Sequence, residues 1–152
     1  MTARHYTSVL LFAALSAVFL SCSPEACFDE TNAYLKATFY SDDTKEKKTP
    51  DSLSVTGIGV TEKLYDRESD VQPGLFPLDA SRGTCSFEIK INDVKDTVTF
   101  LYSSYPHLIS KECGYTFYHR LDTFFCKNES FYIYRSSNNI TTANEENIRI
   151  FY

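Results

Sequence analysis

The sequence of 152 residues lacks tryptophan, so its aromatic side chains are 11 tyrosines and 12 phenylalanines. It also lacks a long apolar run. The longest such run, residues 9–20, covers twelve positions and is interrupted by Ser16. A transmembrane helix needs about 20 apolar residues in succession. The sequence therefore predicts no transmembrane helix.

The usual signatures of enzymes are missing as well. No G-x-S-x-G, H-E-x-x-H or G-x-x-x-x-G-K motif occurs in the sequence. Two histidines follow the first 21 residues: His107 lies in a predicted turn, and His119 lies in a predicted strand between Tyr118 and Arg120. A general base needs a partner within hydrogen-bond reach, and spacing indicates none. No catalytic residue is predicted, and an enzyme is the least favoured function.

Basic residues are fewer than acidic residues in this sequence. Fifteen Lys and Arg stand against 20 Asp and Glu, a formal net charge of −5. Removal of residues 1–21 would take away only Arg4 and change this charge to −6. Binding to nucleic acid requires a basic face. The balance therefore argues against a nucleic-acid partner, and equally against electrostatic docking on anionic lipid.

The first 21 residues have the pattern of an export signal. Arg4 precedes the apolar run, whose twelve residues fit the usual span of about 7–15 for a signal peptide. The stretch "FLSC" then resembles a lipobox, with Ser21 at −1, Cys22 at +1 and Phe19 where leucine is usual. The alternative is ordinary signal peptidase cleavage after Ser23. We favour Cys22 as a lipid attachment site.

Lipidation of Cys22 would fix where the protein resides. A bacterial lipoprotein carries a diacylglyceryl group on this sulfur and usually an acyl group, such as palmitate, on the nitrogen; two or more chains hold stably. The predicted parts are then a signal peptide (1–21), a membrane tether (22–32) and a folded domain (33–152). The eleven residues between Cys22 and Ala33 reach at most about 40 Å. The folded domain is therefore expected close to its membrane.

Four cysteines remain once Cys22 is acylated. An even number in an exported chain predicts disulfides, with three possible connectivities. A metal site is the alternative, but no two cysteines form a C-x-x-C pair and only two histidines are available. We therefore predict no metal and no cofactor. The four cysteines are Cys27, Cys85, Cys113 and Cys126.

Alternation of apolar and polar residues dominates the chain after residue 33, and no stretch has a sustained helical period. Seven strands are predicted on this basis: residues 34–40, 52–60, 84–92, 96–104, 115–121, 130–136 and 147–152. Residues 62–66 and 75–79 are predicted edge strands, the second limited by Pro77. Seven to nine strands predict an all-β fold, an antiparallel β-sandwich. A single sheet closed in up-and-down order is the alternative, which the polar loops 41–52 and 136–147 disfavour.

The aromatic residues of the last strands indicate a surface. One face is predicted to hold Tyr115, Phe117, Phe131 and Ile133. The other is predicted to hold Tyr118, Tyr132, Tyr134 and Phe151 together with Arg120, Arg135 and Arg149. Exposed tyrosines beside arginines can stack on sugar rings or anchor a protein partner. The alternative is cross-strand aromatic pairing that only stiffens the sheet.

Several stretches together resemble a family of uncharacterised lipoproteins, a domain of unknown function, from anaerobic Gram-negative bacteria. They are "TGIGVTEKLYD", "LFPLD", "DTVTF", "KECGY" and "EENIRIFY", with Cys27 near the mature start. The resemblance implies an immunoglobulin-like β-sandwich behind a lipid anchor. It also implies a disulfide between Cys27 and Cys113, which leaves Cys85 and Cys126 as a second predicted pair. It brings no activity and no catalytic residue.

Two functions follow as expectations. The first is a non-enzymatic accessory at the outer membrane, with a structural or protein-binding role and an envelope protein as partner. The second is a small glycan-binding module that uses the face of Tyr118, Tyr132 and Tyr134.

Overall fold

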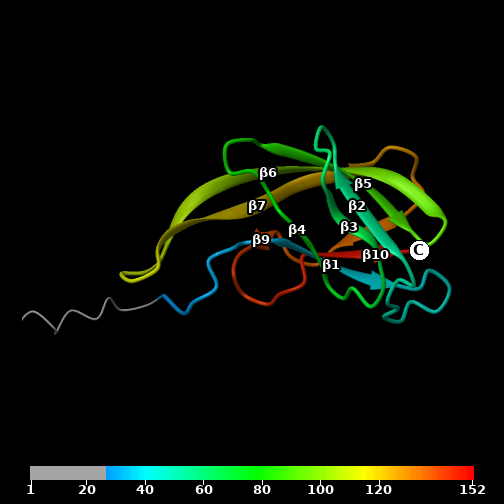
Figure 1. The fold of residues 1–152 in the computed structure, drawn as a ribbon, viewed down its shortest axis with the longest axis horizontal. Coiled ribbons are helices and arrows are strands. Elements are labelled where there is room, and N and C mark those ends of the chain that lie inside the picture. Colours follow the sequence, from blue (N-terminus) through cyan, green and yellow to red (C-terminus); the bar gives the residue numbers. More distant parts are fainter. Residues whose placement is uncertain (1–26) are drawn as a thin grey trace, which may run out of the picture.

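The computed structural model describes residues 27–152, so the predicted export signal and the predicted lipid attachment site, Cys22, lie outside the described residues. The described chain is all-β, with ten strands in two sheets (Figure 1). Within this range, no helix is long and apolar enough to cross a bilayer.

The smaller sheet has four strands in the order β4-β1-β10-β8. They are Gly74–Phe76 (β4), Leu35–Tyr40 (β1), Ile148–Phe151 (β10) and Tyr132–Arg135 (β8). The larger sheet has six strands in the order β3-β2-β5-β6-β7-β9. They are Lys63–Glu68 (β3), Leu53–Gly57 (β2), Thr84–Ile91 (β5), Val94–Ser110 (β6), Gly114–Cys126 (β7) and Asn139–Ile140 (β9).

The two packed sheets confirm the predicted β-sandwich. Two details differ from the expected antiparallel arrangement of seven to nine strands. The first and last strands, β1 and β10, pair in parallel. The short β9 lies inside a segment predicted as a polar loop, where it pairs with β7. The predicted edge strands are present as β3 and β4, and β4 ends at Phe76, just before Pro77.

The core lies between the sheets. Phe76 of the smaller sheet packs against Phe87 and Phe100 of the larger sheet, with ring centroids 5.3 and 6.1 Å apart. The alternation of residues 84–92 predicts that Phe87, Ile89 and Ile91 share one side of a strand. All three are buried, which confirms it. Full burial of one such side chain contributes about 1.5–3 kcal/mol. Burial of these inner faces therefore holds the sheets together.

Strands β6 and β7 form a hairpin that is longer than predicted. They have 17 and 13 residues, whereas the alternation predicts residues 96–104 and 115–121. The yellow-green hairpin in Figure 1 reaches beyond the strands of the smaller sheet. Its neighbour β5 pairs with β6 only as far as Leu101, so the rest of β6 is an edge. Pro106 lies in this edge part, where a sheet tolerates proline.

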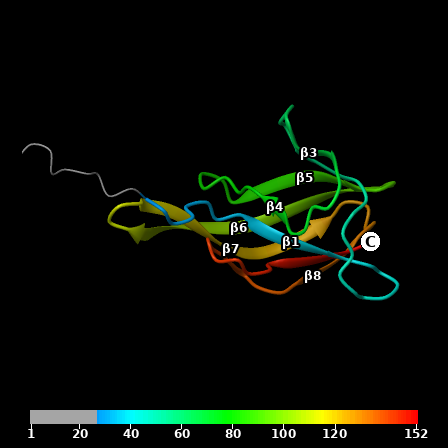
Figure 2. The same ribbon diagram turned by 60° about the horizontal axis from the view of Figure 1, so that its bottom comes forward.

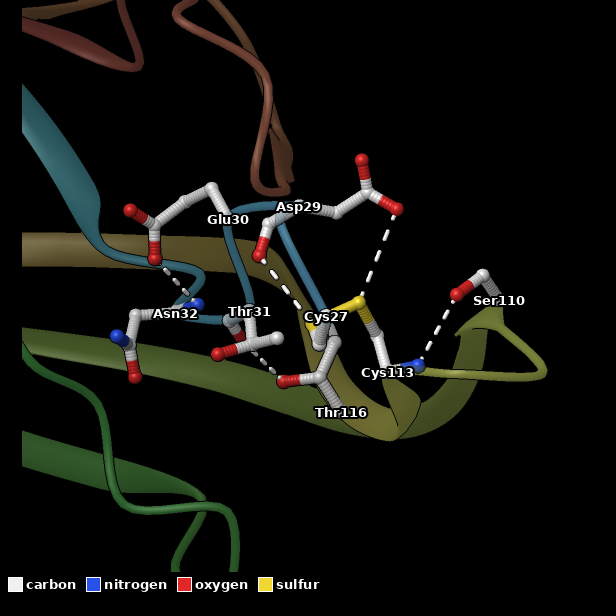
Figure 3. Close-up of a disulfide and its surroundings, with 8 residues drawn as sticks. All are labelled: Cys27, Asp29, Glu30, Thr31, Asn32, Ser110, Cys113 and Thr116. Atoms are coloured by element: carbon white, nitrogen blue, oxygen red, sulfur yellow. Dashed lines mark hydrogen bonds between the residues drawn. A yellow bond between two sulfur atoms is a disulfide. The ribbon is translucent and has the colours of Figure 1, made fainter. Parts of the chain in front are cut away.

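A disulfide joins the start of the described chain to the tip of this hairpin. Cys27 and Cys113 are bonded, with Cα atoms 4.8 Å apart, as the family resemblance implies. The Thr116 hydroxyl donates a hydrogen bond to the Thr31 carbonyl at 2.5 Å (Figure 3). Residues 27–32, predicted as part of a tether, therefore lie against the hairpin.

The predicted second disulfide, between Cys85 and Cys126, is wrong. Cys85 in β5 pairs with Phe100 of β6, whereas Cys126 in β7 pairs with Val98 of β6. One whole strand thus separates the cysteines. Two strand spacings amount to about 9–10 Å, and a disulfide spans Cα atoms no more than about 7 Å apart. Both cysteines are free.

The two thiols have different local partners. The Cys85 sulfur lies 3.0 Å from the hydroxyl of Tyr102. The Cys126 sulfur lies 3.8 Å from the carbonyl of Phe131. Burial, with the nearby negative charges of Asp96 and Glu129, raises the pKa of the Cys126 thiol to about 11. This thiol therefore stays protonated and poorly nucleophilic at neutral pH.

A peptide map of the unreduced protein tests this arrangement. After denaturation and alkylation without reductant, we expect Cys85 and Cys126 on alkylated peptides and Cys27 linked to Cys113. Alkylation before denaturation should label Cys126 slowly because its thiol is half-buried and protonated. A peptide linking Cys85 to Cys126 would contradict the structure.

Candidate functional site

The predicted binding face does not form as one surface. Tyr118 and Arg120 lie in β7 of the larger sheet, whereas Tyr132, Tyr134 and Arg135 lie in β8 of the smaller sheet. The prediction that Tyr118 shares a face with the other two tyrosines is wrong. The physical reason is strand pairing: β7 hydrogen-bonds to β6 and β9, and β8 hydrogen-bonds to β10.

The side chain of Tyr118 is engaged in contacts within the protein. Its ring stacks on His107 with centroids 4.1 Å apart, and its hydroxyl shares a hydrogen bond with the Thr142 hydroxyl at 3.0 Å. The stacking lies within the hairpin, and the hydrogen bond fastens the hairpin to the loop before β10. Arg120 is exposed, and Arg135 donates a hydrogen bond to the Asp122 carbonyl at 2.8 Å.

The structure instead gathers aromatic residues on the outward face of the smaller sheet. Successive register pairs place Tyr40 of β1, Phe151 of β10 and Tyr132 of β8 in one row across the sheet. Ring centroids along this row are 5.2 and 5.6 Å apart. Arg149 and Tyr134 form a pair in the next row. These five residues are called the aromatic face below.

Cations lie over several of these rings. The Lys45 ammonium is 5.2 Å from the centroid of Phe151, and the Arg149 guanidinium is 5.3 Å from that of Tyr40 and 5.8 Å from that of Tyr134. Such contacts orient the rings and limit their movement. Tyr132 is 62% exposed, which leaves its ring open for a ligand or partner.

Glu146 forms the polar edge of the aromatic face. Its carboxylate accepts hydrogen bonds from Arg149 at 2.6 Å, Ser136 at 2.7 Å and the Tyr40 hydroxyl at 3.1 Å. Burial raises the pKa of Glu146, but hydrogen bonds from Arg149, Ser136, Thr38 and Tyr40 outweigh it and hold this pKa below its ordinary value. Burial and the hydrogen bond to Glu146 raise the pKa of Tyr40. The carboxylate is therefore ionised and fixed at neutral pH.

His119, considered above as a possible base, is buried, with only 3% of its surface exposed. Its Nδ1 lies 2.8 Å from the Ser104 hydroxyl, and its ring meets Tyr102 edge-on at 5.4 Å. Burial lowers the pKa of its imidazole. A hollow of about 290 Å³ reaches His119, and none of the described residues that line it carries a carboxylate. Residues 27–152 also contain no group of three His, Cys, Asp or Glu that could hold a metal ion.

Sequence reasoning missed one member of the aromatic face, Tyr40, and two residues in contact with it, Lys45 and Glu146. Tyr40, Lys45 and Glu146 are far from β8 in the chain or lie in segments predicted as polar loops. Alternation does put Tyr40 on the polar side of its strand, which is the one available signal. Nothing local indicates that this side continues onto β10, because the β1–β10 pairing joins the two ends of the domain.

The bonding around Glu146 predicts a pH-dependent stability. A carboxylate with a lowered folded-state pKa stabilises the fold above its unfolded pKa of about 4.3, and this contribution disappears as the pH falls through the folded value. We expect Glu146→Gln to reduce the free energy of unfolding by about 1–2 kcal/mol at pH 7. The difference from the natural protein should vanish below the folded pKa.

Urea denaturation at several pH values measures this effect. Glu145→Gln is the matched control, because Glu145 is the exposed neighbouring residue. A loss of stability in Glu146→Gln that is equal at pH 7 and at pH 3 would contradict the assigned role.

One comparison with known proteins gives a match. A family model described as a family of unknown function (DUF6452) matches residues 52–152. No curated protein and no solved structure matches the chain. The matched range contains Cys113, the long hairpin and every member of the aromatic face except Tyr40. It covers about two thirds of the chain, and the protein therefore belongs to the DUF6452 family.

Proposed function

We propose that this protein is a lipid-anchored, non-enzymatic accessory of the outer membrane, with a structural or protein-binding role. The observation that carries the proposal is the Cys27–Cys113 disulfide. It fastens the chain to the hairpin tip five residues after Cys22, the predicted lipid attachment site. Five residues reach at most about 18 Å, so a lipid on Cys22 would hold this tip close to the bilayer.

The position of the aromatic face supports a binding role. The C-terminus lies at the opposite end of the molecule from the hairpin tip (Figures 1 and 2). Tyr40 and Phe151 are the last residues of β1 and β10, at this far end. A protein anchored near Cys27 would therefore hold the aromatic face away from the membrane. Its exposed rings are those of Tyr132 and Tyr134, and tyrosine and arginine are among the residues that most often carry binding energy at interfaces.

The anchor is tested on the protein purified from its own cells. We expect the N-terminal peptide to begin at Cys22 with a diacylglyceryl group and an acyl chain, as measured by mass spectrometry. Cys22→Ala should move the protein from the membrane fraction to the soluble fraction. An unmodified amino terminus, or membrane retention of Cys22→Ala, would contradict the proposal.

Glycan binding is the second candidate function. The observation that favours it is the adjacent pair of rings, Tyr132 and Phe151, beside the fixed Arg149–Glu146 ion pair. Stacked rings next to charged hydrogen-bonding groups suit a sugar, whose ring has an apolar face and polar edges.

A glycan array on the protein without residues 1–22 separates the two candidates. If the second is right, saturable binding to a glycan should be lost in Tyr132→Ala and kept in Tyr118→Ala, because Tyr118 lies on the other sheet. Absence of saturable binding to any glycan would leave the protein-binding role. Equal loss in both variants would contradict a site on the aromatic face.

A further inference from the structure

The inner side of the long hairpin continues past the sandwich. Residues paired across an antiparallel ladder share a face, and this face recurs at every second residue. Tyr102 pairs with Leu121, and Ser104 pairs with His119, all on the side that faces the smaller sheet. Both Tyr102 and Leu121 belong to the core, and His119 is buried.

The next two pairs on the same side are Pro106 with Phe117 and Leu108 with Tyr115. No register shift falls between Tyr102 and Leu108, so the face is continuous. The strands of the smaller sheet do not reach over these two pairs (Figure 1), and beside Phe117 only a shallow hollow separates the hairpin from residues 31–34. Tyr115 is 74% exposed, and Leu108 and Phe117 are about half exposed.

Phe28 adds to this end of the molecule. It follows the disulfide-bonded Cys27 directly and is 92% exposed. Four of the eleven large apolar side chains that are exposed in residues 27–152 are therefore at or near the hairpin end: Phe28, Leu108, Tyr115 and Phe117. Single exposed apolar side chains are normal, whereas a cluster of them marks an interaction surface. These four residues, with Pro106, are called the hairpin surface below.

We propose that the hairpin surface lies on the bilayer that anchors the protein, with its aromatic rings in the interfacial region. This inference rests on the proposed lipid anchor at Cys22. Along β7, Tyr115 and Phe117 are two and four residues from Cys113, or about 7 and 13 Å. The anchor is at most about 18 Å from Cys27. The hairpin surface and the acyl chains are therefore held within reach of each other.

The proposed anchor favours the bilayer over a soluble protein as the partner of the hairpin surface. The proposed lipid anchor would make this contact intramolecular, and the disulfide holds the hairpin near that anchor. The bilayer would then be present at a high effective concentration, so a weak interaction suffices. A soluble partner would have no such advantage. The residue types also fit, since tyrosine and other amphipathic rings are enriched at the level of lipid headgroups.

The charged residues near the disulfide indicate which lipid headgroups the hairpin surface would contact. Asp29, Glu30 and Glu112 outnumber Lys111 near the disulfide, so attraction to anionic headgroups is not the driving force. The contact should therefore form on zwitterionic lipid and should resist added salt. Burial of apolar area, which salt does not screen, would provide the free energy.

The absence of tryptophan from the sequence permits a direct test. Tyr115→Trp and Phe117→Trp each place a single tryptophan on the hairpin surface. Tyr132→Trp is the control, because Tyr132 is similarly exposed but belongs to the aromatic face. Each acylated protein is reconstituted into phosphatidylcholine vesicles with or without brominated acyl chains, and its emission is recorded.

We expect the first two variants to emit at shorter wavelength and to lose about half of their intensity to brominated lipid, as an interfacial depth of about 5–10 Å implies. The control should emit as a solvated tryptophan. Equal quenching in all three variants, or in none, would overturn the proposal. A blue shift without quenching would place a second copy on this surface and would also overturn it.

The mass of the N-terminal peptide from the same samples separates this proposal from the anchor itself. If Cys22 is acylated but the Tyr115→Trp and Phe117→Trp variants are not quenched, the membrane contact of the hairpin surface is contradicted and the lipid anchor stands. An unmodified Cys22 in protein from its own cells would contradict both the anchor and the membrane contact. Two independent variants at exposed positions guard against a local folding defect in one of them.

Discussion

The structure depends on the burial of two apolar sheet faces against each other. Phe39, Phe76, Phe100 and Ile150 are all completely buried between the sheets. Because the inner faces bury these side chains, the outer faces are free to carry other residues. The aromatic face occupies one of these outer faces. Apart from Phe28, the hairpin surface belongs to the part of an inner face that lies beyond the strands of the smaller sheet.

Buried polar groups fix how the sheets are connected. Asp96 is 1% exposed and accepts backbone hydrogen bonds from Thr97, Asn128 and Ser130 at 2.7–2.9 Å. Burial raises the pKa of Asp96, but these bonds outweigh it and lower the pKa overall, so the carboxylate holds the turn after β7. Asn147 accepts from the Lys36 amide and donates to the Asn139 carbonyl, which links β1 to β9 across the two sheets. Each such bond would be costly to leave unmade in the interior.

The molecule therefore has two different ends. At one end, the disulfide between Cys27 and Cys113 secures the start of the domain to the hairpin tip (Figure 3). At the other end, Tyr40 and Phe151 close their strands beside Tyr132. Attachment at the first end and recognition at the second would give one rigid body two separate tasks.

The sequence by itself determined local features: most of the strand pattern and the limit that Pro77 sets on β4. It also predicts an export signal and lipidation of Cys22, which lie outside the described residues. Alternation reports which residues of a strand share a side, because side chains of a strand point alternately to opposite faces. Only the tertiary structure decided which strands are neighbours. It separated Tyr118 from Tyr132 and Cys85 from Cys126, brought Tyr40 beside Phe151, and extended the hairpin through Pro106. These outcomes depend on pairing between residues far apart in the chain, and no local pattern encodes that pairing.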